Sequence, residues 1–412
     1  MPFTSAEEKP ASLLRNRDFA LAVGARATSF VGDEAAVIAL TLALASRGPW
    51  AVAILMLAGF APLIAMAPLA GVLVDRYDSR RLLVVTGAAQ ALVCLALAFT
   101  TSLPLTIALV AVLATGQSVT SATWSALVPG IVGKENMARA VGLSQAFTNS
   151  AMVIAPAVGG VLVGIGGARL ALLLDVATFA ILVVAGASVR HRRQIARTPG
   201  EPTRWKEGAR VIRADRVLRM LIGMLFLFAL LGAMVNVVGV FLVRYTLHAG
   251  PGWYGAESAV FGCAMVVGSV FMSRIRGQHR LIQGTVLSML MLAASMIGYA
   301  SAPAILWLFF PAVVGGLGNA LLNASVNTVV ALRIPEEVRG RVAATIGGLM
   351  SGAMTGAILL GGVAANLMTP REVFLLGGIV GLAVPLLLGP RLLRQHSIEL
   401  ATEVAAPLPA AA

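Results

Sequence analysis

Residues 82–133 read LLVVTGAAQALVCLALAFTTSLPLTIALVAVLATGQSVTSATWSALVPGIVG, a run of 52 residues without a charged side chain. As one helix this run would be about 78 Å long. A membrane-spanning helix needs only about 20 apolar residues to cross the hydrocarbon core. The run must therefore contain two membrane crossings, and Pro104 lies where the turn between them belongs.

Similar charge-free runs occupy most of the remaining chain. They are Gly48–Val74, Ala140–Ala168, Met220–Val243, Leu281–Leu332 and Val342–Pro370. We therefore predict an all-α polytopic membrane protein with twelve transmembrane helices. The expected helices are 18–45, 49–74, 81–101, 104–132, 137–164, 168–189, 217–243, 254–273, 280–300, 303–332, 339–367 and 371–391.

The composition agrees with this class and excludes others. Apolar residues make up 58% of the chain and charged residues only 12%, against roughly 25% charged in soluble domains. A soluble protein could not cover so much apolar surface, and a disordered chain would be far less hydrophobic. The two cysteines, Cys94 and Cys263, both lie in apolar stretches and indicate no disulfide framework.

The net charge of +13 is explained by membrane topology. If both termini face the cytoplasm, 26 of the 31 basic residues lie there or at that membrane edge, as the positive-inside rule requires. Arg26 falls within a helix, and the four exceptions are Arg47, Arg169, Arg244 and Arg371. We therefore expect a multi-pass protein of a bacterial cell membrane, without a signal peptide and without nucleic acid as a partner.

The two halves of the sequence repeat each other. The two 52-residue runs begin 199 residues apart, and an offset of 202 places Arg169 on Arg371 and Gln117 on Asn319. This pattern predicts two six-helix bundles, residues 1–189 and 217–412, the second with a short cytoplasmic tail. Residues 190–216 form a basic linker, expected to rest on anionic lipid headgroups, in which 203–217 could be an amphipathic helix.

The loop after the second predicted helix contains a charged motif built on Gly71, Asp75, Arg76 and Arg80. It resembles the loop motif of the major facilitator superfamily, although Asp78 stands where glycine is usual. In that motif, a small residue allows close helix approach and the carboxylate pairs with basic groups. The resemblance implies a conformational latch; the alternative is an ordinary charged cytoplasmic loop.

The fifth predicted helix carries small residues and a proline. Its motif consists of Gly142, Pro156, Gly159 and Gly160. It resembles the helix 5 motif of the antiporter branch of this superfamily, with alanine replacing glycine at 151 and 155. The proline bends the helix and the small residues permit close packing, so a packing role alone is the alternative.

Two cytoplasmic stretches, 129–140 and 334–342, and the Leu174-Asp175 pair resemble the drug- and siderophore-exporting branch. That branch includes macrolide efflux proteins and the enterobactin exporter. The resemblance covers essentially the whole chain. It implies a major facilitator fold, made of two parallel six-helix repeats, and an exporter of small molecules.

Ionisable residues inside the predicted spans indicate a functional or structural role, because a charged side chain within the bilayer costs free energy. Asp33 and Glu34 lie about 15 residues into the first helix, which is roughly 22 Å from its start. A buried carboxyl group can exchange a proton, so either residue is a candidate for proton coupling. The alternative is structural pairing, for instance with Arg26.

Three further ionisable residues also lie within the predicted spans. Asp175 in the sixth helix could relay protons or bind a cationic substrate, or it could pair locally, for example with Asn149. Glu257 lies near the outer end of the eighth helix and is expected to meet water. Arg26 is either a counter-ion for an acid or an anchor for an anionic group of the substrate.

Polar residues also occur at equivalent places in both halves. Asn319, Asn323 and Asn327 follow each other at a spacing of four and share a helix face, and Gln117 and Ser121 match them in the first half. They could line a central substrate cavity or hydrogen-bond between neighbouring helices. Asn236, Trp124 and Phe60 could add a mixed polar and aromatic lining.

The sequence therefore predicts a secondary active transporter. The preferred hypothesis is a proton-coupled antiporter that exports an amphipathic antibiotic (as in multidrug resistance), siderophore or secondary metabolite by alternating access, working as a monomer among membrane lipids. The alternative is a proton-coupled importer of a small nutrient on the same fold. No metal spacing, nucleophile motif or phosphate-binding loop stands out, so we expect no enzyme, no cofactor and no metal.

Overall fold

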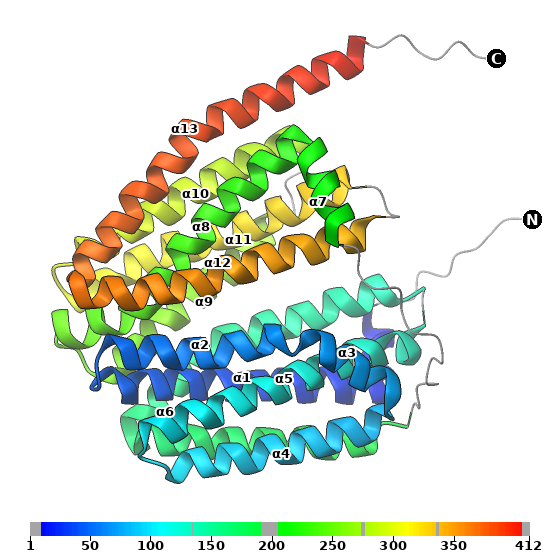
Figure 1. Ribbon diagram of the computed structural model, residues 1–412, viewed down its shortest axis with the longest axis vertical. Helices are drawn as coiled ribbons and strands as arrows, with labels where there is room; N and C mark the ends of the chain where they lie inside the picture. The colour runs from blue at the N-terminus through cyan, green and yellow to red at the C-terminus, as the bar shows by residue number, and fades with distance from the viewer. Residues whose placement is uncertain (1–9, 134, 191–204, 273–276, 335–337, 406–412) are drawn as a thin grey trace, which may run out of the picture. The chain divides into compact units, whose positions relative to one another are not determined.

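A computed structural model describes residues 10–133, 135–190, 205–272, 277–334 and 338–405, and every regular element among them is helical (Figure 1). The chain divides into two compact units, Met1–Gly200 and Glu201–Ala412. The division falls inside the basic linker expected at 190–216. Residues 191–204 of that linker lie outside the described residues.

The first unit contains six α-helices and one short 3₁₀-helix. They are η1 (Pro10–Arg15), α1 (Arg17–Ala45), α2 (Pro49–Ala65), α3 (Ala67–Arg76), α4 (Ser79–Phe99), α5 (Leu103–Val132) and α6 (Met137–Ser188).

The second unit contains seven α-helices with a short π-helix and a 3₁₀-helix. They are α7 (Trp205–Ala214), α8 (Arg216–Phe241), η2 (Leu242–Thr246), α9 (Pro251–Met272), α10 (Gln278–Ala300), η3 (Ile305–Leu308), α11 (Phe309–Arg333), α12 (Arg339–Leu367) and α13 (Pro370–Ala405). The helix expected within 203–217 is thus confirmed as α7.

Ten of the described helices are long and apolar enough to cross a membrane, or eleven when the pair α2 and α3 counts as one span. That pair is bent by 48°, next to Pro62 and Pro68, and proline weakens the helical hydrogen-bond ladder. Twelve helices were predicted, one more than these eleven, because the predicted helices 137–164 and 168–189 both lie within α6. Gly167 interrupts α6 with φ 67° and ψ −172°, a backbone conformation that glycine adopts readily.

The helix packing within the second unit repeats that within the first. In the first unit, α2 and α4 both pack on α5, and α1 and α4 both pack on α6. In the second, α9 and α10 pack on α11, α8 packs on α12 and α13, and α10 packs on α13. This correspondence is the one expected from the offset of about 200 residues between the halves.

Two close helix contacts illustrate the repeat at single residues. A side chain at Gly159 of α6 would lie 3.0 Å from the Ala35 Cα of α1. At Gly361 of α12 it would lie 2.9 Å from the Met234 carbonyl oxygen of α8. Gly361 follows Gly159 by 202 residues and Met234 follows Ala35 by 199, so the same backbone approach occurs in both units.

Arg169 and Arg371, which are equivalent in the internal repeat, each contact the end of another helix in their own unit. Arg169 places its guanidinium 4.2 Å from the ring centre of Phe99, where α4 ends. Arg371 donates a hydrogen bond of 2.8 Å to the carbonyl of Ala302, just after α10. Both arginines were expected on the outer side, and each lies at the end of its unit where these hairpins turn.

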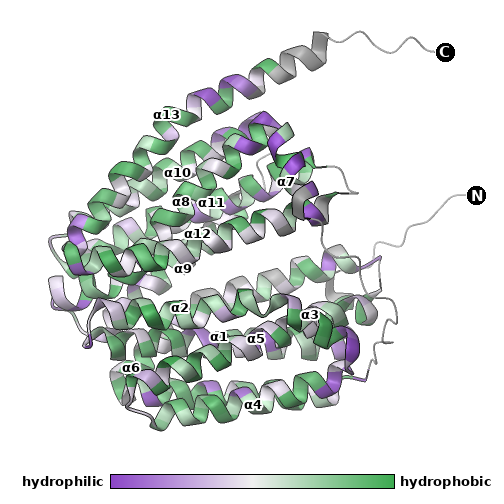
Figure 2. Ribbon diagram, in the orientation of Figure 1, coloured by the Kyte–Doolittle hydropathy of each residue, from purple (hydrophilic) through white to green (hydrophobic). Residues whose placement is uncertain are grey.

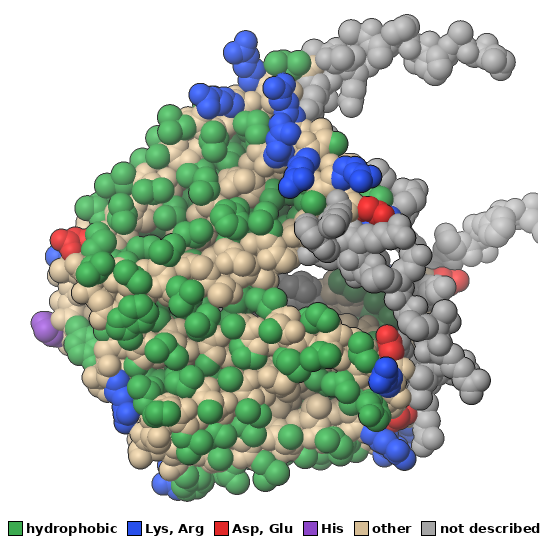
Figure 3. Space-filling view, viewed as in Figure 1, with side chains coloured by type: hydrophobic (Ala, Val, Ile, Leu, Met, Phe, Trp, Pro, Cys, Tyr) green, Lys and Arg blue, Asp and Glu red, His purple; other side chains and the backbone are tan. Residues whose placement is uncertain are grey.

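Apolar side chains cover the flanks of the helices in each unit. Leu92 is 68% exposed and Leu387 is also 68% exposed, which suits contact with lipid rather than water. Figure 2 shows hydrophobic residues along the helix lengths, and Figure 3 shows charged side chains gathered near helix ends. Each unit therefore has the surface expected of a membrane-embedded bundle.

Candidate functional site

Asp33 anchors a hydrogen-bonded series that joins three helices of the first unit. Gln117 of α5 donates a hydrogen bond of 3.0 Å from Nε2 to Asp33 Oδ2 on α1. Gln90 of α4 donates from Nε2 to Gln117 Oε1 at 3.3 Å. Thr120 then donates to Gln90 Oε1 at 3.0 Å. The Asp33 carboxylate is therefore linked by hydrogen bonds to α5 through the Gln117 amide, and to α4 through the Gln90 amide.

Asp175 of α6 is almost completely buried, with 1% of its surface exposed. Its Oδ1 accepts a hydrogen bond of 3.0 Å from Thr178, and its Oδ2 accepts one of 3.4 Å from Cys94 Sγ on α4. The Cys94 thiol also lies 3.4 Å from the Leu172 carbonyl oxygen. Local pairing of Asp175, one of the two expectations, thus involves Thr178 and Cys94.

Asp33 and Asp175 lie near each other, because Gly32, directly before Asp33 on α1, faces the Asp175 carboxylate of α6. Gly32 makes this proximity possible, because a side chain at that position would collide with the Asp175 carboxylate and the Thr178 hydroxyl. We define the carboxylate cluster as Asp33, Asp175, Cys94, Gln90, Gln117 and Thr178. Two carboxylates sharing an apolar interior make a site where the binding of one proton relieves repulsion.

The sequence analysis identified three of the six members: Asp33, Gln117 and Asp175. It missed Gln90, Cys94 and Thr178 as functional candidates. For Gln90 and Cys94, the spacing of four residues within an apolar helix was the available signal. Asn149, proposed as a partner for Asp175, lies in α6, but its side chain is outside the described residues. Among the described residues, no group of three His, Cys, Asp or Glu could hold a metal ion.

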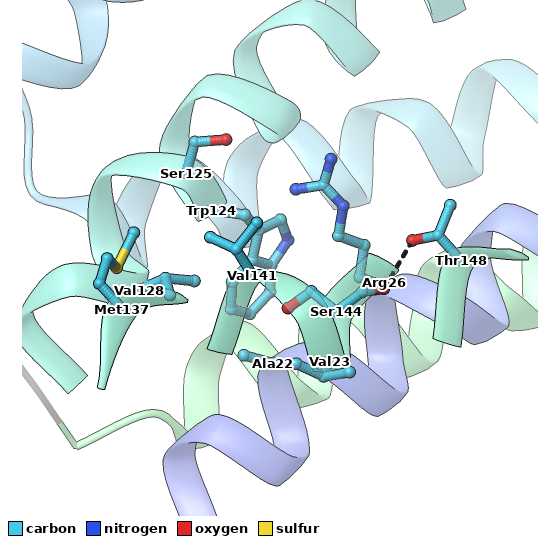
Figure 4. A pocket seen from close by; sticks show the side chains of 10 residues that line it. All are labelled: Ala22, Val23, Arg26, Trp124, Ser125, Val128, Met137, Val141, Ser144 and Thr148. Atoms are coloured by element: carbon cyan, nitrogen blue, oxygen red, sulfur yellow. Dashed lines mark hydrogen bonds between the residues drawn. The ribbon is translucent and has the colours of Figure 1, made fainter. Parts of the chain in front are cut away.

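Arg26 lies two turns before Asp33 on α1 and does not pair with it in the part of the chain described. Its Nη2 donates a hydrogen bond of 3.3 Å to Ser121 Oγ on α5. The guanidinium borders a pocket of about 210 Å³ within the first unit (Figure 4). The pocket is lined by Ala22, Val23, Arg26, Trp124, Ser125, Val128, Met137, Val141, Ser144 and Thr148.

Glu257 of α9, which was expected to meet water, is half-buried and has protein partners. Tyr299 of α10 donates a hydrogen bond to Glu257 Oε1, and Ser258 donates one of 3.4 Å to Oε2. The Tyr299 ring also contacts Phe374 of α13, with 5.2 Å between ring centres. Sequence reasoning did not anticipate Tyr299, since it lies 42 residues from Glu257.

Two of the three asparagines that share one face of α11 are hydrogen-bonded to each other. Asn323 Nδ2 donates to the Asn319 side-chain oxygen at 2.6 Å and to its carbonyl at 2.9 Å. Asn323 and Asn327 are exposed and Asn319 is half-buried. Asn236 of α8 is exposed and belongs to the second unit, whereas Trp124 and Phe60 belong to the first.

The loop motif lies where α3 ends and α4 begins. Asp75, Arg76 and Arg80 are exposed there, and a side chain at Gly71 would meet only open space. Asp78, which replaces the usual glycine, has φ −62° and accepts a hydrogen bond of 3.1 Å from Arg81 N. The turn therefore needs no glycine, and the aspartate caps α4 instead.

The helix 5 motif divides into residues with different surroundings. Gly159 packs on the Ala35 backbone and Gly160 is buried, while a side chain at Gly142 would meet open space. Pro156 lies inside α6. The carboxyl-terminal part of the motif therefore brings α6 close to α1 at Ala35, two residues after the carboxylate Asp33.

Comparison with known proteins identifies similar chains. The family model described as Major Facilitator Superfamily matches residues 23–352. Macrolide efflux protein A of Streptococcus pyogenes is 23% identical over 335 residues, covering 78% of this chain and 82% of the relative. The protein of the same name from Enterococcus faecalis is 23% identical over 312 residues, covering 72% and 96%.

Solved structures share the fold at low identity. A crystal structure of a POT family transporter in complex with a thioalcohol-conjugated peptide has a TM-score of 0.70 at 12% identity, covering 91% of this chain and 96% of its own. A crystal structure of the nucleoside transporter NupG also has a TM-score of 0.70 at 12% identity, covering 90% and 97%.

Proposed function

Because this chain belongs to the Major Facilitator Superfamily of transporters, we propose that it is a proton-coupled antiporter that exports amphipathic small molecules. Its family makes it a multi-pass membrane transporter and not an enzyme. Antiport, export and the substrate class are the proposed parts. The observation that carries the proposal is the carboxylate cluster, in which Asp33 and Asp175 lie near each other between α1, α4, α5 and α6.

Export is supported by the relatives and by α6. The relatives at 23% identity are named macrolide efflux proteins, which suggests an antibiotic, a siderophore or a similar secondary metabolite as cargo. The helix 5 motif resembles that of antiporters, and its Gly159 holds α6 against α1. The helix 5 motif therefore controls the distance between α6 and α1, and with it the packing around Asp33 on α1.

The orientation of the amides around Asp33 supports proton coupling. An ionised Asp33 accepts from Gln117 Nε2, while Gln117 Oε1 accepts from Gln90. Protonation at Oδ2 would make that oxygen a donor, so Gln117 would have to turn its amide and then lose its match with Gln90. One proton would thereby change hydrogen bonds on α1, α5 and α4, and so bias one conformation of the unit.

In this cycle, substrate binds from the cytoplasm while the cluster is deprotonated. A proton from outside then neutralises the cluster and releases the substrate outward. Loss of the proton to the cytoplasm resets the carrier. We propose a monomer in a bacterial cell membrane with both termini in the cytoplasm, two bundles at 1–189 and 217–412, and 190–216 as their linker.

The test is transport by the purified full-length chain in liposomes with an imposed pH gradient. We expect substrates from a panel of antibiotics and siderophores to move against their gradient, and a protonophore to stop that movement. Empty liposomes and liposomes with the Asp33→Asn variant are the controls. Movement that is equal with and without the pH gradient would contradict proton coupling.

The direction of transport is tested in the same vesicles. In an antiporter, substrate and protons move in opposite directions, so an inward proton gradient drives substrate outward. In a proton-coupled importer they move together. Co-directional movement of a nutrient with protons would replace the export proposal by the import alternative.

A further inference from the structure

The pocket beside Arg26 contains a buried hydrogen-bond donor without an acceptor. Trp124 of α5 is 2% exposed, and its Nε1 has no hydrogen-bond partner among the described residues. Figure 4 shows the indole nitrogen on the side of the ring that faces Arg26. A buried N–H group without an acceptor is unfavourable, so an acceptor supplied by a ligand would complete the site.

The charge of the pocket selects the kind of acceptor. Among the ten described residues that line the pocket, Arg26 is the only charged one and none carries a carboxylate. Its described hydrogen bond to Ser121 uses one nitrogen, Nη2, and leaves other guanidinium donors for a ligand. A carboxylate or phosphate group could accept from both Arg26 and Trp124, whereas a cationic group would be repelled.

The remaining residues that line the pocket indicate the chemistry of the part of the ligand next to its anionic group. Ala22, Val23, Val128, Met137 and Val141 are apolar. Two of the three hydroxyl groups donate to nearby backbone carbonyls, from Ser125 to Ser121 and from Thr148 to Ser144. The volume of about 210 Å³ is below the roughly 300–1000 Å³ of a site for a whole drug-sized ligand. It therefore suits one end of a larger molecule.

We propose that this pocket binds the anionic end of an amphipathic substrate, with Arg26 and Trp124 as its two donors. The proposal rests on the proposed transport function and narrows its substrate class to anions with an apolar part. The site is separate from the carboxylate cluster on the same helix, so substrate and proton bind to different residues of α1.

The test is equilibrium binding of three radiolabelled probes that share a naphthyl group to the full-length chain in nanodiscs: naphthylacetate, naphthylacetamide and naphthylethylamine. They carry an anionic, a neutral and a cationic end. We expect naphthylacetate to bind at least about tenfold more tightly than the other two, as charge-assisted hydrogen bonds predict. Equal binding of the amide or the amine, or no binding of the carboxylate, overturns the proposal.

Two variants assign the effect to the named donors. Arg26→Gln should remove the preference for the carboxylate and leave naphthylacetamide binding unchanged. Trp124→Phe keeps a ring in place but removes the N–H, and should weaken both probes that offer a carbonyl oxygen. Arg47→Gln, in the turn just after α1, is the matched control, because Arg47 donates to the Thr101 carbonyl outside the pocket. An unchanged preference in Arg26→Gln contradicts the proposal.

The binding measurements use no proton gradient, so a failure of the pocket proposal can be distinguished from a failure of the antiport proposal. Intact anion binding with gradient-independent transport would contradict only the antiport proposal. Intact proton-driven export without anion preference would contradict only the pocket assignment.

Discussion

Gln117 Nε2 on α5 lies 3.0 Å from Asp33 Oδ2 on α1 and donates a hydrogen bond to it. This contact joins the amino-terminal helix to a neighbour through the residue that we propose to carry the proton. Beyond Gln117, the series continues to Gln90 and Thr120. The state of one carboxylate is thus connected to hydrogen bonds on two other helices.

The first prediction concerns Gln117. Gln117→Leu should slow proton-driven export about ten- to a hundredfold, the range for a hydrogen bond to a charged group. The reason is that Asp33 keeps its charge but loses its connection to Gln90. Initial rates in liposomes at a fixed pH gradient provide the measurement. Ser118→Ala, on the same helix next to Gln117, is the control; equal effects of both variants would argue against the relay.

The second prediction concerns Gly32. Gly32→Ala should destabilise the protein by about 1–3 kcal/mol, as overpacking does, because the new methyl group collides with Asp175 and Thr178. Gly24→Ala on the same helix meets open space and should be neutral or stabilising, since alanine favours helix. Thermal unfolding in detergent compares the two. A Gly32→Ala variant as stable as Gly24→Ala would show that α1 and α6 are farther apart.

The third prediction uses the internal repeat. Gly159→Ala and Gly361→Ala should each lower the unfolding temperature, because both glycines face the backbone of a neighbouring helix at about 3 Å. Gly142→Ala, from the same motif, meets open space and should leave stability unchanged. If Gly142→Ala nevertheless abolishes transport while remaining folded, the motif has a role in antiport beyond packing.

The fourth prediction concerns the loop between α3 and α4. Asp75→Asn should slow the conformational cycle without abolishing ligand binding, because the proposed latch needs its charge. Asp78→Asn is the control: asparagine still caps a helix, so α4 keeps its first turn. Transport rate and equilibrium binding are measured on both. Loss of binding in Asp75→Asn would contradict a latch role.

The charge-free runs predicted the helical class and the hairpins, because the length of a membrane crossing is fixed by the bilayer. They also predicted the break within α6, because the expected helices 137–164 and 168–189 are separated at Gly167, where the backbone is not helical. They did not predict the bend between α2 and α3, since a proline permits several local geometries. The extension of α13 to Ala405 beyond the expected end at 391 likewise had no apolar signal. Helix boundaries outside the apolar runs depend on local capping.

The candidate site was predictable only in part. Asp33 and Asp175 were identified because charges inside apolar helices are rare, but their proximity depends on Gly32 and on the packing of α1 against α6. Cys94 and Tyr299 were not anticipated as partners, because their contacts join residues 81 and 42 positions apart. A single sequence contains no information on such pairings beyond polarity.

The most direct test of the central claim is Asp33→Asn in proteoliposomes, measured in two assays on the same preparation. The account predicts that uphill export driven by a pH gradient falls to background while substrate counterflow without a gradient continues, because only proton binding is lost. Asp18→Asn, near the start of the same helix, should retain both activities. Gradient-driven export by Asp33→Asn at the wild-type rate would contradict the account.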